Sequence, residues 1–179
     1  TLSQLVVAFE GDSMNRIRIH KQWTLRKENE NMDATKFSKV TQVGFVVRDM
    51  DKAIAGMKAI FGAEPKLATL QNPENKYRGQ PSDCVAQLAY FNFANIELEF
   101  IMPISGKSIW QDFLDEGHEG IHHVRFEVDD NTAATKAMTD KGITIYAQGP
   151  SLAYPGKQWT YFDTFDQLRF IVEMINTAE

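Results

Sequence analysis

An internal repeat of about eighty residues constrains the fold of this chain more than any other feature. In each half, alternating apolar residues indicate a strand, acidic residues then begin a helix, and a glycine ends that helix. The first strand starts at Val43 and its helix stops before Gly62, whereas the second strand starts at Val124 and its helix stops before Gly142. Equivalent residues lie 80 or 81 positions apart, so the sequence predicts a duplicated fold.

Each half also ends in apolar strands, which completes a βαβββ pattern in both. We expect helices at residues 53–61 and 132–141, strands at 85–93, 96–102, 143–146, 159–162 and 168–175, and a linker helix at 109–114. The predicted class is α+β, with module 1 at residues 38–104, a linker at 105–119 and module 2 at 120–179. The strands of both modules are expected to form one curved, partly closed mixed sheet around a shared site.

Residues 1–37 do not share the repeat and are interpreted as an N-terminal extension. Basic residues without an intervening acid between Arg16 and Lys27 leave a nucleic-acid or membrane arm open as an alternative. Acidic residues flank this cluster on both sides, which favours an added edge strand or a tail.

Charge and cysteine content narrow the classes of function. The 179 residues carry a net charge of −5, so we expect no nucleic-acid partner and no membrane partner, and a small molecule is the expected ligand. The single cysteine, Cys84, excludes an internal disulfide and fits a cytoplasmic protein. No apolar run approaches the roughly 18 residues that a membrane-spanning helix needs.

Four polar residues occupy matching points of the repeat. Gln42 directly precedes the first strand of module 1, and His123 directly precedes the equivalent strand of module 2. Glu99 and Glu173 each lie inside the last apolar strand of their module. A duplicated sheet that closes on itself would bring these side chains onto one concave surface. One amide oxygen, one imidazole and two carboxylates suit a single divalent ion such as Co, Ni, Mn, Mg or Zn, with positions left open for a substrate.

Taken singly, each of the four has an ordinary alternative as a surface residue of a strand. His122 is adjacent to His123 and should point to the opposite face, as a surface residue or as a support for the site. The match with Gln42 selects His123 as the ligand. Glu97 competes with Glu99 on the same face, and Glu99 is favoured because it lies deeper in its apolar run.

Three stretches of the chain resemble a known family. They are residues 43–53 (VGFVVRDMDKA), 96–103 (IELEFIMP) and 119–124 (EGIHHV). These stretches are similar to methylmalonyl-CoA epimerase and its relatives in the vicinal-oxygen-chelate superfamily, which includes glyoxalases, bleomycin resistance proteins and dioxygenases. The resemblance covers about residues 38–176. It implies the vicinal-oxygen-chelate fold and places the four metal ligands of the family on Gln42, Glu99, His123 and Glu173.

The chain also departs from the epimerase pattern. Epimerases typically carry histidine where this chain has Gln42, and the order Gln, Glu, His, Glu resembles the ligands of animal-type glyoxalase I. The second acid/base glutamate of epimerases falls near Asp83, which has a turn-forming aspartate as its alternative. Residues 161–164 (YFDT) look like a broader glyoxalase-like subgroup.

The resemblance implies metal-dependent transfer of a proton next to a carbonyl, with Glu173 as base and Asp83 or Glu99 as the second group. The expected activity is that of an epimerase acting on an acyl-CoA, in a homodimer. A lyase of the glyoxalase I type is the first alternative, and a non-catalytic binding protein of the antibiotic resistance type is the second. An oxygen-activating iron enzyme would need two histidines, and the matched positions offer only His123.

Overall fold

The computed structural model describes residues 37–176, which lie within one compact unit of the chain, Met32–Glu179. The predicted extension at residues 1–37 lies outside the described residues, with the exception of Phe37, and so does its basic cluster.

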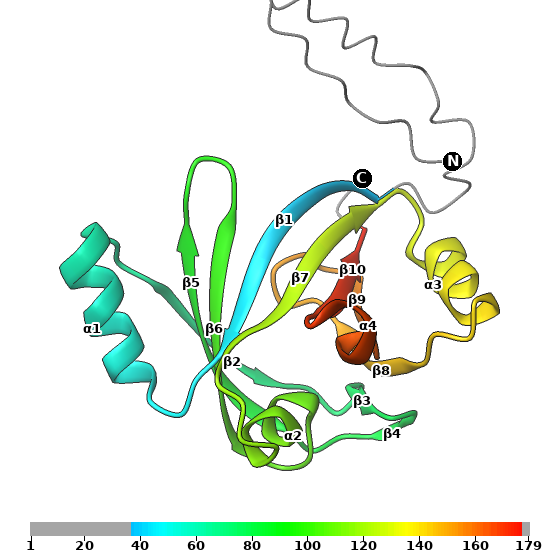
Figure 1. The fold of residues 1–179 in the computed structure, drawn as a ribbon, viewed down its shortest axis with the longest axis horizontal. Coiled ribbons are helices and arrows are strands. Elements are labelled where there is room, and N and C mark those ends of the chain that lie inside the picture. The colour runs from blue at the N-terminus through cyan, green and yellow to red at the C-terminus, as the bar shows by residue number, and fades with distance from the viewer. Residues whose placement is uncertain (1–36, 177–179) are drawn as a thin grey trace, which may run out of the picture. The chain divides into compact units, whose positions relative to one another are not determined.

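The described region forms one mixed sheet of ten strands in the order β2-β5-β6-β1-β7-β10-β9-β8-β3-β4 (Figure 1). The strands are β1 (Phe37–Val46), β2 (Lys66–Gln71), β3 (Lys76–Tyr77), β4 (Gln80–Pro81), β5 (Val85–Asn92), β6 (Glu97–Ser105), β7 (Gly120–Val128), β8 (Ile145–Pro150), β9 (Gln158–Phe162) and β10 (Ile171–Ile175). The helices are α1 (Met50–Phe61), α2 (Ile109–Asp115), α3 (Asn131–Asp140) and α4 (Phe165–Leu168). The predicted fold class, two βαβββ modules in a curved mixed sheet, is confirmed.

Strand pairing repeats between the modules. In module 1, β1 pairs with β6 in parallel, and in module 2, β7 pairs with β10 in parallel. The two modules join through the antiparallel pair β1–β7, in which Val43 faces Val124. Because these two valines are equivalent in the repeat, the pairing has an approximate twofold axis between them. The four central strands β6, β1, β7 and β10 therefore carry equivalent positions onto one face.

Capping residues in the sequence determine where the helices α1 and α3 begin and end. The Asp49 side chain accepts a hydrogen bond from the backbone nitrogen of Lys52 and begins α1, which ends at Gly62 with a φ of 65°. Asp130 caps α3 in the same way through the backbone nitrogens of Thr132 and Ala133. Such caps satisfy backbone donors that have no partner within the helix. No helix in residues 37–176 is long and apolar enough to cross a membrane.

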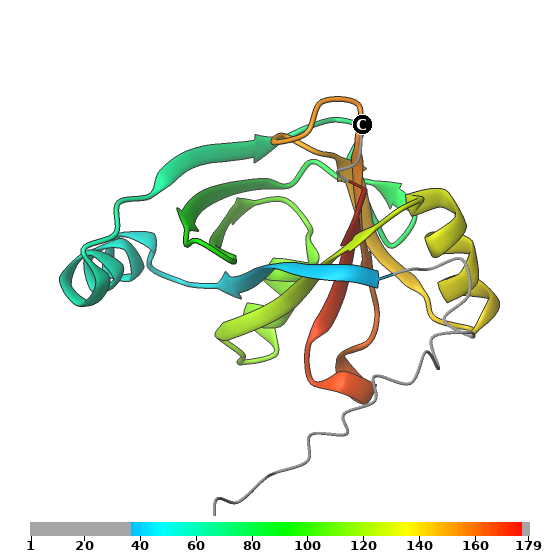
Figure 2. The ribbon, with the colours of Figure 1, turned by 90° about the horizontal axis from the view of Figure 1, so that it is seen from above.

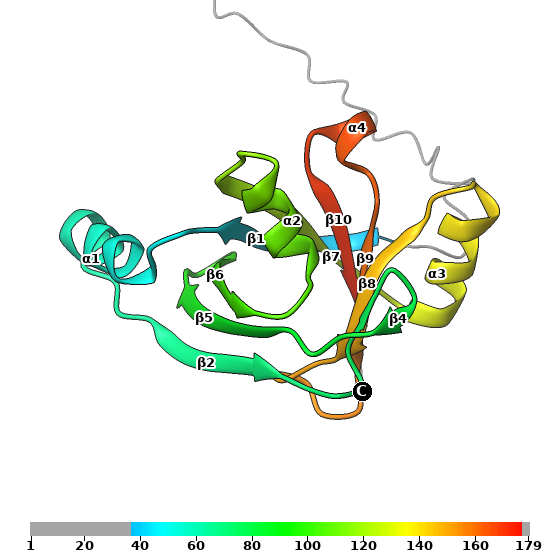
Figure 3. The ribbon, with the colours of Figure 1, turned by 90° about the horizontal axis from the view of Figure 1, so that it is seen from below.

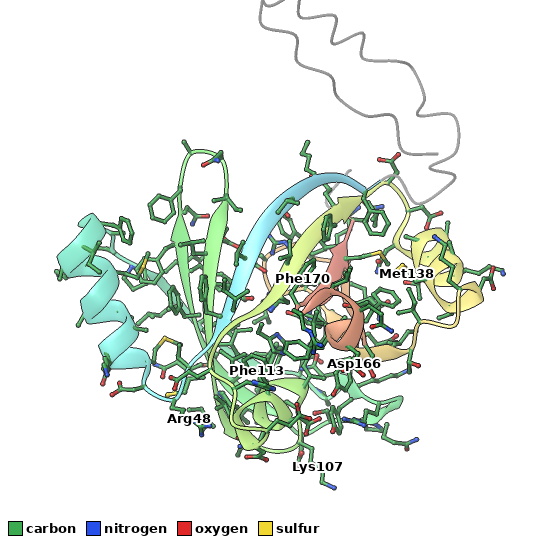
Figure 4. The ribbon with its side chains drawn as sticks, in the orientation of Figure 1. Arg48, Lys107, Phe113, Met138, Asp166 and Phe170 are labelled. Atoms are coloured by element: carbon green, nitrogen blue, oxygen red, sulfur yellow. The ribbon has the colours of Figure 1, made fainter. Side chains whose placement is uncertain are left out.

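The helices cover different faces of the sheet. Figures 2 and 3 show the sheet curling, with α1 and α3 outside the curl and α2 at its concave side. Met57 of α1 belongs to the same buried cluster as Phe91 of β5. Met138 of α3, which is labelled in Figure 4, belongs to the same buried cluster as Phe162 and Met174. Residues of α2 pack instead with inward-facing side chains of both modules, among them Val46, Leu88, Ile101, Trp159 and Ile171. The concave interior is therefore closed by α2.

Four details differ from the sequence-based expectation. The edge strand β2 was not predicted, because its side chains are mostly exposed and show no clear apolar alternation. The hairpin β3–β4 was not predicted either, and it pairs with β8 of the other module. The strand expected at 143–146 begins at Ile145, since the Ile143 backbone nitrogen still bonds to α3. The strand expected at 168–175 begins at Ile171, since Leu168 belongs to α4 and Arg169 ends that helix with a φ of 62°.

Candidate functional site

Each of the four central strands places one candidate ligand on the concave face. Gln42 lies on β1, Glu99 on β6, His123 on β7 and Glu173 on β10. All four are buried, with exposed fractions of 1%, 6%, 0% and 4% in that order. Four polar side chains so far from solvent must be satisfied by one another or by a bound group, because burying them unpaired is costly.

Three oxygen atoms from these residues approach a single nitrogen of His123. Nε2 lies 3.2 Å from Oε1 of Gln42, 3.3 Å from Oε2 of Glu99 and 3.4 Å from Oε2 of Glu173. The structure therefore brings together the four residues that the repeat selected, with the imidazole at their centre.

The strand register explains why Glu99, and not Glu97, reaches His123. Glu99 pairs with Gly44, and Glu173 pairs with Arg125, which is the repeat equivalent of Gly44. Glu99 and Glu173 are therefore equivalent positions. Glu97 pairs with Gln42 instead, and its Oε1 accepts a hydrogen bond of 2.7 Å from Nε2 of that amide.

A glycine makes room for the imidazole. Gly44 faces His123 across the β1–β7 pair, and a Cβ built on Gly44 would lie 1.8 Å from Cε1 and 2.1 Å from Nε2 of the His123 ring. No side chain can occupy that space while the ring keeps its place. Sequence reasoning did not identify Gly44, although a glycine inside a strand often marks such a close approach.

His122 lies in the interior as well. The register shifts between Gly44 and Phe45, which pair with His123 and Ile121, so His122 is the extra residue of a bulge. This bulge removes the strict alternation on which the expectation of opposite faces rested. His122 is fully buried against Phe113 of α2, and its Nδ1 lies 3.1 Å from Nδ1 of His123. The role of a support for the site fits this position, and that of a surface residue does not.

The contact between the two Nδ1 atoms bears on the tautomer of His123. One of the two nitrogens must carry the hydrogen if the pair is hydrogen-bonded. When His123 donates from Nδ1 to His122, its Nε2 is left unprotonated and faces the three oxygens. Burial, together with the charge of Arg125, lowers the pKa of His123 to about 3, so the ring is neutral at neutral pH. A neutral imidazole with a free Nε2 is the form that binds metals.

The two carboxyl groups are held in an environment that opposes their charge. Burial raises the pKa of Glu99 to about 7 and the pKa of Glu173 to about 8, although the positive charge of Arg125 lowers both. No described residue donates a hydrogen bond to Oε2 of Glu173, which is also buried. The cluster is therefore short of positive charge and of one donor.

Two tyrosines that sequence reasoning did not identify support the carboxyl groups. Tyr90 of β5 pairs with Glu99, and Tyr161 of β9 pairs with Glu173. Each hydroxyl hydrogen-bonds its partner and lowers the pKa of that carboxyl group. The two pairs are equivalent in the repeat. Only the cross-strand register reveals them, since the sequence separation differs between the modules.

A small cavity of about 50 Å³ adjoins the cluster. Glu99, Arg125 and Glu173 line one part of it, and apolar side chains including those of Leu88, Ile101 and Trp159 line the rest. Larger hollows of about 740 and 540 Å³ lie elsewhere, around β3, β4 and β8, and include none of the four candidate ligands. The small cavity is the better candidate site because two of the four candidate ligands, Glu99 and Glu173, line it together with the buried Arg125.

Asp83 lies apart from this cavity. It is exposed in the connection between β4 and β5, next to Gly106, and it is not among the residues that line the cavity.

The donors fit a divalent ion in chemistry and spacing. Ligands about 2.1 Å from one ion lie roughly 3.0 to 3.4 Å from each other, which matches the spacing around Nε2 of His123. An ion would also supply the missing positive charge and a partner for Oε2 of Glu173. No group of three or more His, Cys, Asp and Glu side chains in residues 37–176 is arranged so that it could hold a metal ion. Binding would therefore require the oxygen of Gln42 and a rearrangement of the side chains.

Comparisons with known proteins agree with this architecture. A bovine (Bos taurus) mitochondrial methylmalonyl-CoA epimerase is 26% identical over 76% of this chain and 73% of its own length. The methylmalonyl-CoA epimerase of Mycobacterium tuberculosis shares the fold, with a TM-score of 0.59 at 18% identity over 78% of this chain and 88% of its own. A Streptomyces coelicolor methylmalonyl-CoA epimerase in complex with 2-nitronate-propionyl-CoA gives a TM-score of 0.59 at 20% identity over 78% and 94% of the two chains.

The sequence also matches a family model directly. Residues 41–161 match the model of the Glyoxalase/Bleomycin resistance protein/Dioxygenase superfamily, which covers more than half of the chain. The predicted vicinal-oxygen-chelate fold is thereby confirmed, and the chain belongs to the Glyoxalase/Bleomycin resistance protein/Dioxygenase superfamily.

Proposed function

We propose that this protein is a metal-dependent enzyme that moves a proton next to the thioester carbonyl of a short branched acyl-CoA, as methylmalonyl-CoA epimerase does. One observation carries the proposal. Three oxygens from β1, β6 and β10 approach Nε2 of the buried His123 at 3.2 to 3.4 Å, beside a cavity with apolar walls.

Gln42, Glu99, His123 and Glu173 would hold one divalent ion, such as Co, Ni, Mn, Mg or Zn. When bound, the ion would supply positive charge that stabilises negative charge developing on the carbonyl oxygen of the substrate. The protein prepares the site by keeping His123 neutral, with its ring fixed by Gly44 and His122.

The carboxylate of Glu173 is the proposed base. It removes the proton from the carbon next to the carbonyl, so the C–H bond breaks, an O–H bond forms, and the electron pair passes into the carbonyl group to give an enolate. A second carboxyl group then returns a proton to the other face of that carbon. Of the two candidates for this role, Glu99 lines the cavity together with Glu173, whereas Asp83 does not. This placement favours Glu99.

The names of the relatives support the substrate class. The bovine and Mycobacterium tuberculosis proteins are methylmalonyl-CoA epimerases, and the Streptomyces coelicolor structure contains a propionyl-CoA analogue. Leu88, Ile101 and Trp159 give the cavity apolar walls suited to a small acyl group. The homodimer and the cytoplasmic location stay predictions.

Gln42 favours a second candidate, a lyase of the glyoxalase I type. Its amide oxygen stands 3.2 Å from His123 where epimerases typically carry a histidine. Such an enzyme would move the proton to the adjacent carbon of a thiohemiacetal.

Solvent exchange tests the proposal. Protein loaded with Mn²⁺ or Co²⁺ is incubated in D₂O with one epimer of methylmalonyl-CoA, and NMR follows the α-proton. We expect deuterium to enter that position and the other epimer to form, with His123→Ala inactive. Turnover of methylglyoxal with glutathione, without any exchange on acyl-CoA, would favour the lyase instead. Inactivity toward both substrates would leave the binding protein as the remaining interpretation.

A further inference from the structure

Glu97 is a polar residue of the concave face that the proposed chemistry does not use. It lies on β6, two residues before Glu99, and its side chain is 21% exposed. Its Oε1 accepts a hydrogen bond of 2.7 Å from Nε2 of Gln42, the residue with which it pairs in the strand register. This hydrogen bond is shorter than the 3.2 Å contact between Oε1 of Gln42 and Nε2 of His123.

A glutamine amide can turn either its oxygen or its nitrogen toward a site, and only the oxygen can bind a cation. An ionised carboxylate accepts hydrogen bonds and donates none, so Glu97 attracts the NH₂ group of Gln42 and repels its oxygen. With the nitrogen held by Glu97, the oxygen of Gln42 lies 3.2 Å from Nε2 of His123. The reverse orientation would place two acceptor oxygens 2.7 Å apart, which is unfavourable.

From this geometry we propose that Glu97 is a positioning residue that turns the Gln42 amide oxygen toward His123, and so allows glutamine to serve as a ligand. The proposal rests on the proposed function, because it assigns Glu97 a role toward the same ion.

The repeat offers an independent argument. The equivalent of Gln42 is His123, and the residue that pairs with His123 in the position of Glu97 is Ile171. An imidazole whose Nε2 faces the site needs no neighbour to choose between oxygen and nitrogen, and an apolar residue stands there. The acid is present only in the module whose ligand is an amide.

Arg125 offers a competing explanation for Glu97. One guanidinium nitrogen of Arg125 lies 3.5 Å from Oε1 of Glu97, and its Nε donates to Oγ1 of Thr41 at 3.1 Å. Glu97 could therefore serve only to balance a buried cation. The contact with Gln42 is shorter by 0.8 Å, but the two roles need an experiment that separates them.

The experiment combines two substitutions of Glu97 with two backgrounds. Isothermal titration with Mn²⁺ compares Glu97→Leu, which removes the acceptor, with Glu97→Gln, which keeps an acceptor oxygen without the charge. We expect Glu97→Leu to weaken Mn²⁺ binding at least about tenfold, and Glu97→Gln, whose amide can present either an oxygen or a nitrogen to Gln42, to weaken it less than Glu97→Leu does. In the Gln42→His background, Glu97→Leu should change the affinity less than about threefold, since no amide remains to be oriented.

A second measurement does not depend on the ion. In ¹H–¹⁵N NMR spectra of the metal-free protein, the side-chain NH₂ of Gln42 should exchange slowly with solvent, and Glu97→Leu should abolish that protection while Glu97→Gln retains part of it. Unchanged protection in Glu97→Leu would overturn the inference, as would an equal loss of affinity in both backgrounds, which would assign Glu97 to Arg125. Protection that behaves as expected in a protein without Mn²⁺ affinity would refute the proposed function and leave the orientation by Glu97 standing. Thermal unfolding confirms that each variant is folded.

Discussion

The two halves of the site share a skeleton and differ in chemistry. Both halves place a glutamate on the last strand of the module, and both pair it with a tyrosine from the neighbouring strand. The two halves differ on the first strand of each module. At the two equivalent positions, β1 has Gln42 and Gly44 whereas β7 has His123 and Arg125. The glutamate–tyrosine pairs are therefore the same in both modules, whereas the differing residues of β1 and β7 give the two carboxyl groups different surroundings.

This difference shows how a symmetric sheet produces an asymmetric site. Gly44 has no side chain, so the ring of His123 can lie over β1. Arg125, the repeat equivalent of Gly44, instead places a positive charge close to Glu99 and Glu173. One carboxyl group thus pairs in register with a glycine and the other with an arginine. Two chemically similar groups in unequal surroundings can take different roles in proton transfer.

The largest expected effect is on catalysis, where substitutions of Glu173 and Glu99 should affect opposite epimers of the substrate. Glu173→Gln should lower α-proton exchange on one epimer of methylmalonyl-CoA by about 100-fold or more, because an amide cannot accept the proton. Glu99→Gln should do the same on the opposite epimer. Each variant keeps exchange on its other epimer, because the remaining carboxyl group can both remove and return the proton there. NMR in D₂O with saturating Mn²⁺ measures both rates. Loss of exchange on the same epimer in both variants would show that the halves do not act on opposite faces.

The next effect concerns the glycine that distinguishes module 1. Gly44→Ala should reduce the free energy of unfolding by at least about 2 kcal/mol, because its Cβ would lie 1.8 Å from the His123 ring. Gly56 of α1 is a matched control, since a Cβ there meets no atom within 4 Å. Gly56→Ala should leave stability unchanged or raise it by up to about 1 kcal/mol. Urea denaturation measures both changes. Equal changes in the two variants would show that the His123 ring does not occupy the space next to Gly44.

A third prediction follows from the raised pKa values of Glu99 and Glu173. Each pKa is higher in the folded protein than in the unfolded chain, so the associated stability is complete below the unfolded value and is lost as pH rises through the folded value. The metal-free protein should therefore lose stability from about pH 4.5, the ordinary pKa of a glutamate, up to about pH 8, by at most about 1.4 kcal/mol per pH unit for each group. Urea denaturation in EDTA tests this. The double variant Glu99→Gln/Glu173→Gln should show a much smaller slope, and an unchanged slope would point to other groups.

The smallest expected effect concerns the tyrosine–glutamate pairs that the two modules share. Tyr90→Phe and Tyr161→Phe each remove one hydrogen bond to a carboxyl group, which is worth about 1 kcal/mol. Each should weaken Mn²⁺ binding by several-fold, to a similar degree. A tenfold difference between the two variants in calorimetric affinity would show that the shared skeleton is not functionally symmetric.

The repeat was sufficient to predict the central strands and the four candidate ligands. The pattern is strong in β10, where all five residues are buried, and in β1, where the buried Gln42, Gly44 and Val46 alternate with less buried residues. The hairpin β3–β4 was missed because strands of two residues carry no periodicity. Its pairing with β8 depends on the folded sheet.

Roles that depend on strand register were out of reach of the sequence. Alternation places Glu97 and Glu99 on the same face, and only the pairing of β6 with β1 assigns one to Gln42 and the other to the neighbourhood of His123. His122 was misplaced because a bulge shifts the register by one residue. The pairs Tyr90–Glu99 and Tyr161–Glu173 could not be predicted either, because each tyrosine lies on a different strand from its glutamate and only the strand register brings them together.

The central claim is that Gln42, Glu99, His123 and Glu173 bind one divalent ion. Anomalous scattering from crystals grown with Mn²⁺ tests it most directly. We expect one strong anomalous peak per chain, within coordination distance of Oε1 of Gln42, Nε2 of His123 and one carboxylate oxygen from each of the two glutamates. The peak should be absent in His123→Ala. A map without a peak at this cluster, or with a Mn²⁺ ion bound only by other residues, would contradict the claim.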